Sequence, residues 1–222
     1  DSVKQWSASM CRTFLRRIAF PSVAGSRRTI GVLALQGDVR EHESVLDTLG
    51  VAHRQIRKAA DLSGIDGLII PGGESSVIDK LARIFEVREP LCDAIANGLP
   101  VLGTCAGLIL LSTTVIGAID GQQTFGGLDI VVERNAFGGQ RESFETTIDM
   151  PVTGNVPVKA AFIRAPIIRD VGKCEVVAVL PNGDVVGVRS QNCVGIAFHP
   201  EVVGETRVHE WWLNSVVANV QR

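Results

Sequence analysis

The chain has 222 residues, of which 45% are hydrophobic, and its formal net charge at pH 7 is −2. This balance gives no electrostatic case for binding nucleic acid or a membrane surface. No apolar stretch reaches the roughly 18 residues that a membrane-spanning helix needs. The length is enough for one large α/β domain or for two small domains.

The cysteines also exclude two classes of protein. There are five of them, spread along the chain without a C-x-x-C pair. This pattern argues against a disulfide framework and against a structural zinc site. Because free thiols persist in reducing compartments, we expect a cytoplasmic protein.

The first 28 residues differ in charge from the rest of the chain. Residues 1–28 hold six lysine and arginine residues and one acidic residue, Asp1. Residues 10–20 are Arg-rich and amphipathic, which is typical of an organelle transit segment. An expression remnant, a mis-assigned start or a docking helical extension are the alternatives. We expect residues 1–28 to form a flexible extension or leader, and residues 29–222 to form the functional domain.

Strands and helices alternate at short spacing after this extension. Short apolar runs predict strands, and apolar positions at helical spacing predict helices. The expected strands are 30–35, 53–56 and 67–70, and the expected helices are 39–49, 59–62, 76–85 and 87–97. This order is typical of an α/β protein with a mostly parallel central sheet flanked by helices, as in flavodoxin-like folds.

Two polar residues belong to the first expected helix. Asp38 stands at its start, where a carboxylate can cap backbone N–H groups. His42 lies on or near the inner apolar stripe of the helix, which predicts a buried structural histidine rather than a catalytic one.

A glycine-rich loop follows the strand 67–70. In open α/β sheets, ligands bind along the carboxyl edge of the strands. The backbone N–H groups of Gly72 and Gly73 would suit an oxyanion hole there, and Glu74 could bind an amino group. The alternative is an ordinary glycine turn, with Glu74 and Ser75 in a helix cap.

The segment 99–111 predicts a buried strand, a tight turn and the start of a helix. Its centre, Gly103-Thr-Cys-Ala-Gly107, has the form of a nucleophile elbow, with cysteine where hydrolases often carry serine. Small flanking residues fit because such a turn crowds its own backbone. The sulfur of Cys105 would emerge at the carboxyl edge of the sheet, near a helix N-terminus that favours the thiolate. The alternative is a buried structural cysteine in a βα turn.

The pattern changes after this elbow. We expect a loop over 116–127 and a helix from about 205 to 220, with Trp212, Val216 and Val220 on its inner face. The intervening strands are expected at 128–133, 144–149, 159–163, 175–180, 184–189 and 193–198. With a hairpin turn at 181–183, this run predicts an antiparallel patch appended to the parallel sheet.

The last of these strands leads into His199-Pro200-Glu201. A catalytic thiol needs a base, and the base needs a group that orients it. Residues i and i+2 of an extended segment point the same way, so the carboxylate of Glu201 can hold one imidazole nitrogen of His199. The other nitrogen would then face Cys105. As an isolated motif, His-Pro-Glu is more often a simple loop.

Together these motifs resemble those of the class I (triad) glutamine amidotransferases. Further blocks resemble the glutaminase subunits of pyridoxal 5'-phosphate synthase, in the order found in that family. These blocks are Gly31-Val-Leu-Ala-Leu-Gln-Gly37, Pro71-Gly-Gly-Glu-Ser75, Val132-Glu-Arg-Asn-Ala-Phe-Gly138, Phe162-Ile-Arg-Ala-Pro166 and Phe198-His-Pro-Glu201. Gly139 departs from the family pattern, which often has a larger residue there.

The resemblance implies a role for each matching residue. Cys105 would be the nucleophile, His199 the acid and base, and Glu201 the residue that orients His199. The backbone of Gly73 and Ala106 would form the oxyanion hole. The residues implied to contact glutamine are Gly73, Glu74, Ser75, Arg134, Ile163 and Arg164.

The resemblance also implies hydrolysis of L-glutamine to L-glutamate and ammonia, with no metal or cofactor in this chain. Its partner would be a (β/α)8 pyridoxal 5'-phosphate synthase subunit, in a hetero-oligomer that receives the ammonia. Two alternatives remain: a glutaminase subunit of a different amidotransferase, and a non-catalytic module that only binds a partner.

Overall fold

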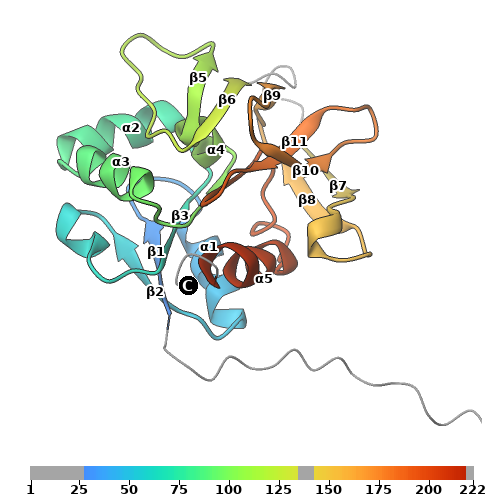
Figure 1. The fold of residues 1–222 in the computed structure, drawn as a ribbon, viewed down its shortest axis with the longest axis horizontal. Helices are drawn as coiled ribbons and strands as arrows, with labels where there is room; N and C mark the ends of the chain where they lie inside the picture. Colours follow the sequence, from blue (N-terminus) through green and yellow to red (C-terminus); the bar gives the residue numbers. More distant parts are fainter. Residues whose placement is uncertain (1–27, 135–142, 219–222) are drawn as a thin grey trace, which may run out of the picture.

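A seven-stranded sheet forms the centre of the molecule (Figure 1). The computed structural model describes residues 28–134 and 143–218. The strands, in spatial order, are β10 (Glu175–Val179), β11 (Val185–Arg189), β12 (Cys193–Ile196), β4 (Val101–Thr104), β3 (Gly67–Ile70), β1 (Thr29–Leu33) and β2 (Ala52–Ile56). From β12 to β2 all neighbours are parallel, whereas β11 is antiparallel to both of its neighbours. The mostly parallel central sheet expected from the sequence is therefore confirmed.

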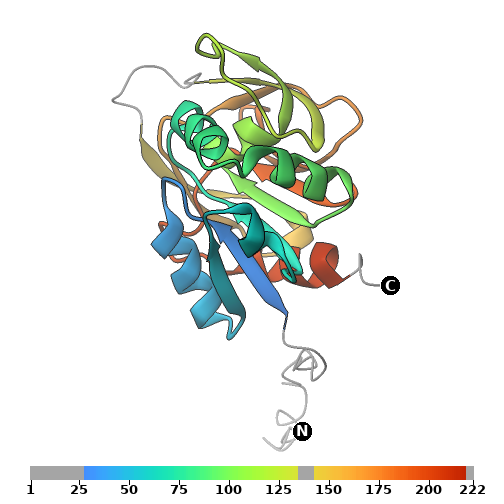
Figure 2. The same cartoon turned by 90° about the vertical axis from the view of Figure 1, so that its left-hand side faces the viewer.

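Helices cover both faces of this sheet (Figures 1 and 2). One face carries α1 (Val39–Thr48), α5 (Arg207–Trp212) and the π-helical turn η3 (Leu213–Val217); the other carries α2 (Ser75–Ile84) and α3 (Arg88–Ala96). Short 3-10 turns, η1 (Ala59–Leu62) and η2 (Pro151–Thr153), complete the connections. The strands β3, β4 and β12 are buried along their whole length, because helices cover them on both sides.

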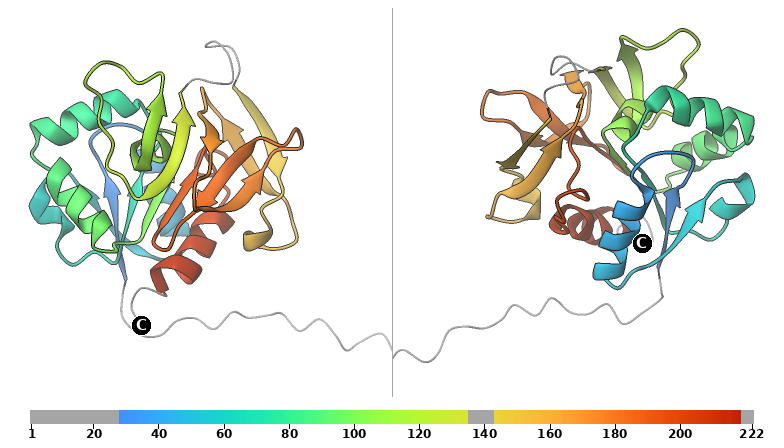
Figure 3. Two further views of the ribbon diagram at one scale, coloured as in Figure 1. Left: turned by 45° about the horizontal axis from the view of Figure 1, so that its top comes forward. Right: turned by 180° about the vertical axis from the view of Figure 1, so that it is seen from behind.

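The antiparallel patch is divided among three places. β10, β11 and β12 extend the central sheet, and the hairpin turn at 181–183 joins the first two. A small mixed sheet contains β5 (Ser112–Ile116), β6 (Leu128–Glu133) and β9 (Ile167–Asp170); β6 is antiparallel to β9 but parallel to β5, contrary to the expected antiparallel pattern. An antiparallel hairpin contains β7 (Phe144–Ile148) and β8 (Val158–Phe162). Both small sheets lie toward the β10–β11 end of the molecule (Figures 1 and 3).

The part of the chain after the elbow differs most from the sequence prediction, which contained neither β5 nor β9 and carried the strand β12 to residue 198. The elbow helix α4 (Ala106–Leu111) has only six residues, and β5 begins immediately after it at Ser112. The β-branched run from Thr113 to Ile116 favours a strand and shortens the expected loop. The last helix contains α5 and then a π-helical turn rather than one continuous α-helix.

The core residues expected on that last helix are buried. Trp212 and Val216 are 0% and 4% exposed, whereas Val220 lies outside the described residues. The extension 1–27, with its Arg-rich segment and Cys11, and the segment 135–142, with Gly139, also lie outside them. Within the described residues, none of the helices is long and apolar enough to cross a membrane.

Candidate active site

The candidate site lies at the carboxyl edge of the central sheet. Because β1, β3, β4 and β12 are parallel, the loops that follow them meet at one edge. These loops carry Asp38, Gly73, Cys105 and His199 respectively. The structure therefore brings the nucleophile, base and oxyanion candidates of the sequence analysis to one place.

Cys105 occupies the expected sharp turn between β4 and α4. Its backbone has φ of +47°, a conformation that non-glycine residues rarely adopt. Its N–H donates to the carbonyl of Ile196 at 2.8 Å. A Cβ on Gly107 would lie 2.1 Å from the carbonyl oxygen of Ile70, so this flanking position requires glycine. The turn is thus held in a strained geometry that is frequent at functional sites.

The Cys105 side chain faces the loop after β8. Its Sγ lies 3.8 Å from the carbonyl oxygen of Ile163, and Cys105 is 6% exposed. The next residue, Arg164, also has a positive φ, +46°, and its side chain is exposed. Ile163 is therefore placed beside the candidate nucleophile, whereas the Arg164 side chain is directed to the surface.

His199 and Glu201 lie side by side, as the i, i+2 spacing predicted. His199 Nδ1 is 2.9 Å from Glu201 Oε1, and both side chains are almost fully buried. Nε2 of His199 has no hydrogen-bond partner among the described residues. Burial raises the pKa of Glu201. For His199, burial lowers the pKa, but the favourable interactions of the ring with Asp38, Cys105 and Glu201 outweigh burial and raise the pKa to about 12.

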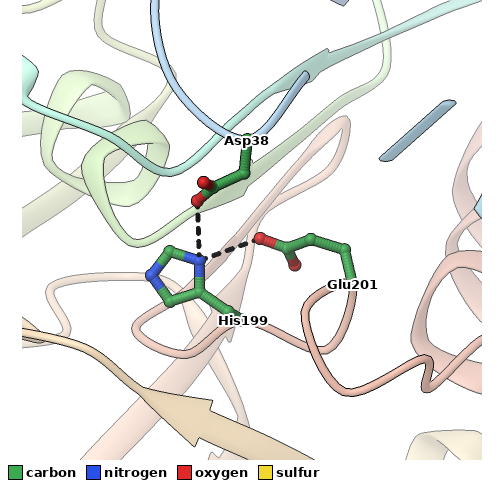
Figure 4. A group of neighbouring side chains, drawn as sticks. All are labelled: Asp38, His199 and Glu201. Carbon is green, nitrogen blue, oxygen red and sulfur yellow. Dashed lines mark hydrogen bonds and ion pairs between the residues drawn. The ribbon is translucent and has the colours of Figure 1, made fainter. Parts of the chain in front are cut away.

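A second carboxylate, which the sequence analysis did not assign, faces the same nitrogen. Asp38 Oδ2 is 3.2 Å from His199 Nδ1 (Figure 4). Asp38 is the N-cap residue of α1, as the sequence predicted, but its side chain makes no cap hydrogen bond. The signal in the sequence was the position of Asp38 just after β1, at the same sheet edge as the other candidates.

Asp38, His199 and Glu201 are also close enough together to be considered as a metal site. However, Nδ1 already lies at hydrogen-bond distance from both carboxylates. A metal ion bound to Nδ1 would have to replace the hydrogen that Nδ1 donates to them. The geometry is that of a hydrogen-bonded cluster around an imidazole, and we assign no metal to it.

The glycine loop after β3 packs against the imidazole. Gly73 has φ of +151°, and a Cβ on Gly72 would lie 2.2 Å from His199 Cε1. The N–H of Glu74 donates to Gln36 Oε1 at 2.7 Å, so the loop after β1 braces this segment. Ala106, the other oxyanion candidate, is the first residue of α4 and is 1% exposed.

The candidate glutamine contacts at the start of α2 and just after β6 form one polar chain. Arg134 Nη2 is 2.5 Å from Glu74 Oε1, and Arg134 Nη1 donates to Gln122 Oε1 at 2.7 Å. Gln122 Nε2 in turn donates to Ser75 Oγ at 3.1 Å. Glu74 stands at the N-cap position of α2 but makes no cap hydrogen bond with its side chain. The sequence contained no signal for Gln122, which joins Ser75 to the pair of Arg134 and Glu74.

A buried histidine pair lies behind Glu201. His42 Nδ1 is 2.9 Å from His209 Nε2, and His42 Nε2 is 3.1 Å from Thr104 Oγ1 and 3.5 Å from Glu201 Oε1. Burial, followed by the charges of His209 and His199, holds the pKa of His42 well below its usual value. Burial lowers the pKa of His209 to about 4. Both rings are therefore neutral near pH 7, and His42 is buried as predicted.

These neutral rings have a preferred proton arrangement. A carboxylate only accepts hydrogen bonds, so Glu201 favours the His42 tautomer with its proton on Nε2. His42 Nδ1 then accepts from the Nε2–H of His209. The other nitrogen of His209, Nδ1, has no partner among the described residues. In this tautomer Nδ1 carries no hydrogen, so no N–H group is buried without an acceptor.

Comparisons with known proteins identify the family of this chain. The model of the SNO glutamine amidotransferase family matches residues 32–218. The chain belongs to this family. The pyridoxal 5'-phosphate synthase subunit PdxT of Leifsonia xyli subsp. xyli is 54% identical to this family member over 199 residues, which cover 89% of this chain and 100% of that protein. PdxT of Clavibacter sepedonicus is 52% identical over 197 residues, covering 88% and 94% of the two chains.

Solved structures share the fold of this chain. A crystal structure described as a glutamine amidotransferase has a TM-score of 0.79 and 40% identity, and the match covers 85% of this chain and 98% of that one. The PurLQS structure from Thermotoga maritima contains a chain with a TM-score of 0.60 and 17% identity, and the match covers 89% of this chain and 100% of that one. The second likeness concerns the fold alone.

Proposed function

We propose that this SNO family member is the glutaminase subunit of a pyridoxal 5'-phosphate synthase and hydrolyses L-glutamine to L-glutamate and ammonia. The observation that carries the proposal is the placement of Cys105, His199 and Glu201 at one sheet edge, in a chain about half identical to PdxT subunits over most of its length. In this role the chain hydrolyses an amide and supplies the ammonia for vitamin B6 biosynthesis.

In the first half-reaction, the Cys105 thiolate attacks the side-chain amide carbon of glutamine. Negative charge develops on the amide oxygen, and the N–H groups of Gly73 and Ala106 receive it. When the tetrahedral intermediate collapses, the C–N bond breaks and the His199 imidazolium gives its proton to the departing nitrogen. Ammonia leaves, and a glutamyl thioester stays on Cys105.

In the second half-reaction, water attacks the thioester carbon while neutral His199 accepts a proton from it. The C–S bond breaks, glutamate leaves, and the thiolate and imidazolium are restored. Glu201 holds Nδ1 through both steps at 2.9 Å, which keeps Nε2 directed to the reacting atoms. Burial raises the pKa of Glu201, and the adjacent imidazolium offsets this effect only in part.

The amino-acid end of glutamine would be held by the polar chain at the start of α2 and just after β6. Arg134 and Glu74 now pair with one another at 2.5 Å. A bound amino acid offers a carboxylate to Arg134 and an ammonium to Glu74, so it satisfies both charges. We assign Ser75, the backbone of Gly73 and Ile163, and Arg164 to the same glutamine site.

The ammonia would pass to a (β/α)8 synthase subunit bound to this chain in a hetero-oligomer. The support is the similarity of this chain to relatives that are themselves subunits of pyridoxal 5'-phosphate synthase. We place the complex in the cytoplasm, which agrees with the four free cysteines of the described residues.

The test is glutamate release from glutamine, measured with and without the synthase subunit from the same organism. We expect activity that the partner increases and that Cys105→Ala removes. Cys92→Ala is the matched control, because Cys92 lies on α3 away from the sheet edge. Retained activity in Cys105→Ala would refute the thioester route, and activity indifferent to this partner would refute the assignment of the acceptor.

A further inference from the structure

The two carboxylates around His199 are not equivalent. Glu201 comes from the same loop and its side chain is 0% exposed, whereas Asp38 comes from the loop between β1 and α1 and is 35% exposed. Nδ1 carries one hydrogen at most. Glu201, at the shorter distance, is its acceptor, and Asp38 acts on the ring mainly through its charge.

Asp38 is also tied to the oxyanion segment through its backbone. Its N–H donates to the carbonyl of Gly72 at 3.1 Å. The approach requires glycine on both sides: a Cβ on Gly37 would lie 1.8 Å from Gly72 O, and one on Gly72 would lie 2.8 Å from Asp38 Oδ2. The loop of Asp38, the segment of Gly72 and the imidazole of His199 are therefore in direct contact.

Four titratable groups of the described residues surround the imidazole of His199. Asp38 and Glu201 contribute two carboxylates, Cys105 contributes the thiolate of the proposed mechanism, and His42 on α1 is buried and neutral. A second negative charge at 3.2 Å stabilises the imidazolium over the neutral ring. The imidazolium is the form that must protonate the leaving ammonia.

We infer that Asp38 is a positioning residue for the proposed glutaminase reaction: its carboxylate holds His199 as an imidazolium, and its backbone fixes that ring against the Gly72–Gly73 segment. Asp38 does not touch the substrate and acts through His199. The inference rests on the proposed function, although its physical core, the charge state of His199, can be measured without substrate.

Asp38→Asn is the informative change, because it keeps the size and removes the charge. Glu41→Gln is the matched control, since Glu41 is exposed on the first turn of the same helix. The protonation of His199 is followed by 15N NMR of histidine-labelled protein over a range of pH, with His199→Gln to assign its signal. We expect His199 in Asp38→Asn to lose its proton at least about 1 pH unit lower than in wild type.

The kinetic arm uses the complex with its synthase subunit. We expect kcat/KM for glutamine to fall about tenfold in Asp38→Asn, because one of the two negative charges that stabilise and hold the imidazolium is lost while Glu201 remains. KM should change little, since Asp38 makes no substrate contact. Glu41→Gln should match wild type in both measurements.

Each result decides the question. If His199 keeps its proton over the same pH range in Asp38→Asn as in wild type, or if kcat/KM is unchanged, the inference is overturned. An Asp38→Ala variant that is impaired while Asp38→Asn is normal would mean that Asp38 only fills space. Failure of the proposed function is seen separately, as glutaminase activity that survives Cys105→Ala.

Discussion

Gly72 and His199 are in such close contact that Gly72 has no room for a side chain. A Cβ at this position would lie 2.2 Å from Cε1 and 2.8 Å from Nδ1 of the imidazole. The segment that carries the oxyanion candidate Gly73 is therefore packed directly on the candidate base. The same contact therefore fixes the position of the candidate base and of the candidate oxyanion segment.

This contact predicts the effect of Gly72→Ala. The added methyl group must push the imidazole or the segment aside, so we expect glutamate release to fall about 100-fold or more. The measurement is kcat/KM of the complex with its synthase subunit, with thermal unfolding as the check on folding.

Gly50→Ala is the contrasting variant. Gly50 has φ of +68° and no atom lies within 4 Å of an added Cβ. We expect it to lose about 1 kcal/mol of stability through backbone strain and to keep full activity. Equal activity losses in the two variants would contradict the packing argument.

Arg134→Gln should weaken glutamine binding. It removes the cation that pairs with Glu74 at 2.5 Å and that we assign to the substrate carboxylate. A lost charge-assisted hydrogen bond is worth about 1.5–3 kcal/mol, so KM should rise about 10- to 100-fold with a smaller change in kcat. Steady-state kinetics of the complex measure both.

Arg169→Gln is the matched control for Arg134. Arg169 pairs with Glu133, the neighbour of Arg134, at 2.6 Å, but this pair is on the surface. Surface ion pairs contribute little, so we expect unchanged KM. A rise in KM as large as that of Arg134→Gln would show that the effect comes from β6 as a whole.

The sequence alone predicts the elements whose geometry is determined by neighbouring residues of the chain. The buried strands β3 and β4 follow from continuous apolar runs, and the Cys105 turn follows from its small flanking residues. The proximity of His199 and Glu201 follows from their spacing of two. In each case a short range of chain determines the geometry.

The contacts that were missed join distant parts of the chain. Aspartate at the start of a helix is the residue type expected for a cap. The carboxylate of Asp38 faces the imidazole only because the β1–α1 loop packs against His199. His42 was assigned correctly to the interior, but its partner His209 is 167 positions away. No local pattern specifies such a pair.

Glu201→Gln should impair the reaction more than Asp38→Asn does. Glutamine can place its carbonyl oxygen near Nδ1 but has no charge to balance the imidazolium, and His199 should lose its proton at a lower pH. We expect kcat to fall about 100-fold or more, with the residual activity supported by Asp38. Steady-state kinetics over a range of pH give the comparison.

Glu205→Gln is the control for Glu201→Gln, because it also neutralises a buried carboxylate of the same part of the chain. Glu205 is 7% exposed and pairs with Arg207 and the backbone N–H of Lys159, away from the imidazole. We expect it to lower the free energy of unfolding and to leave kcat unchanged. If kcat fell as much as in Glu201→Gln, the loss would reflect general destabilisation of this loop.

The His42–His209 pair should make the protein sensitive to acid. His209 has a usual pKa of 6.5 when unfolded and a pKa of about 4 in the fold. Between these values the unfolded chain binds a proton that the folded chain does not, so stability falls as the pH falls. The difference corresponds to about 3 kcal/mol for His209 at most, and His42, also lowered, acts in the same direction.

His209→Gln tests this origin of the acid sensitivity. Glutamine keeps a donor for His42 Nδ1 but does not titrate, so we expect a lower free energy of unfolding at pH 7 and a flatter decline between pH 6.5 and 4. Urea unfolding at several pH values measures both, on the full chain. His53→Gln, on β2 outside the pair, removes a histidine without touching it and should leave the decline as steep as in wild type. A decline that is equally steep in His209→Gln would assign the acid sensitivity to other groups.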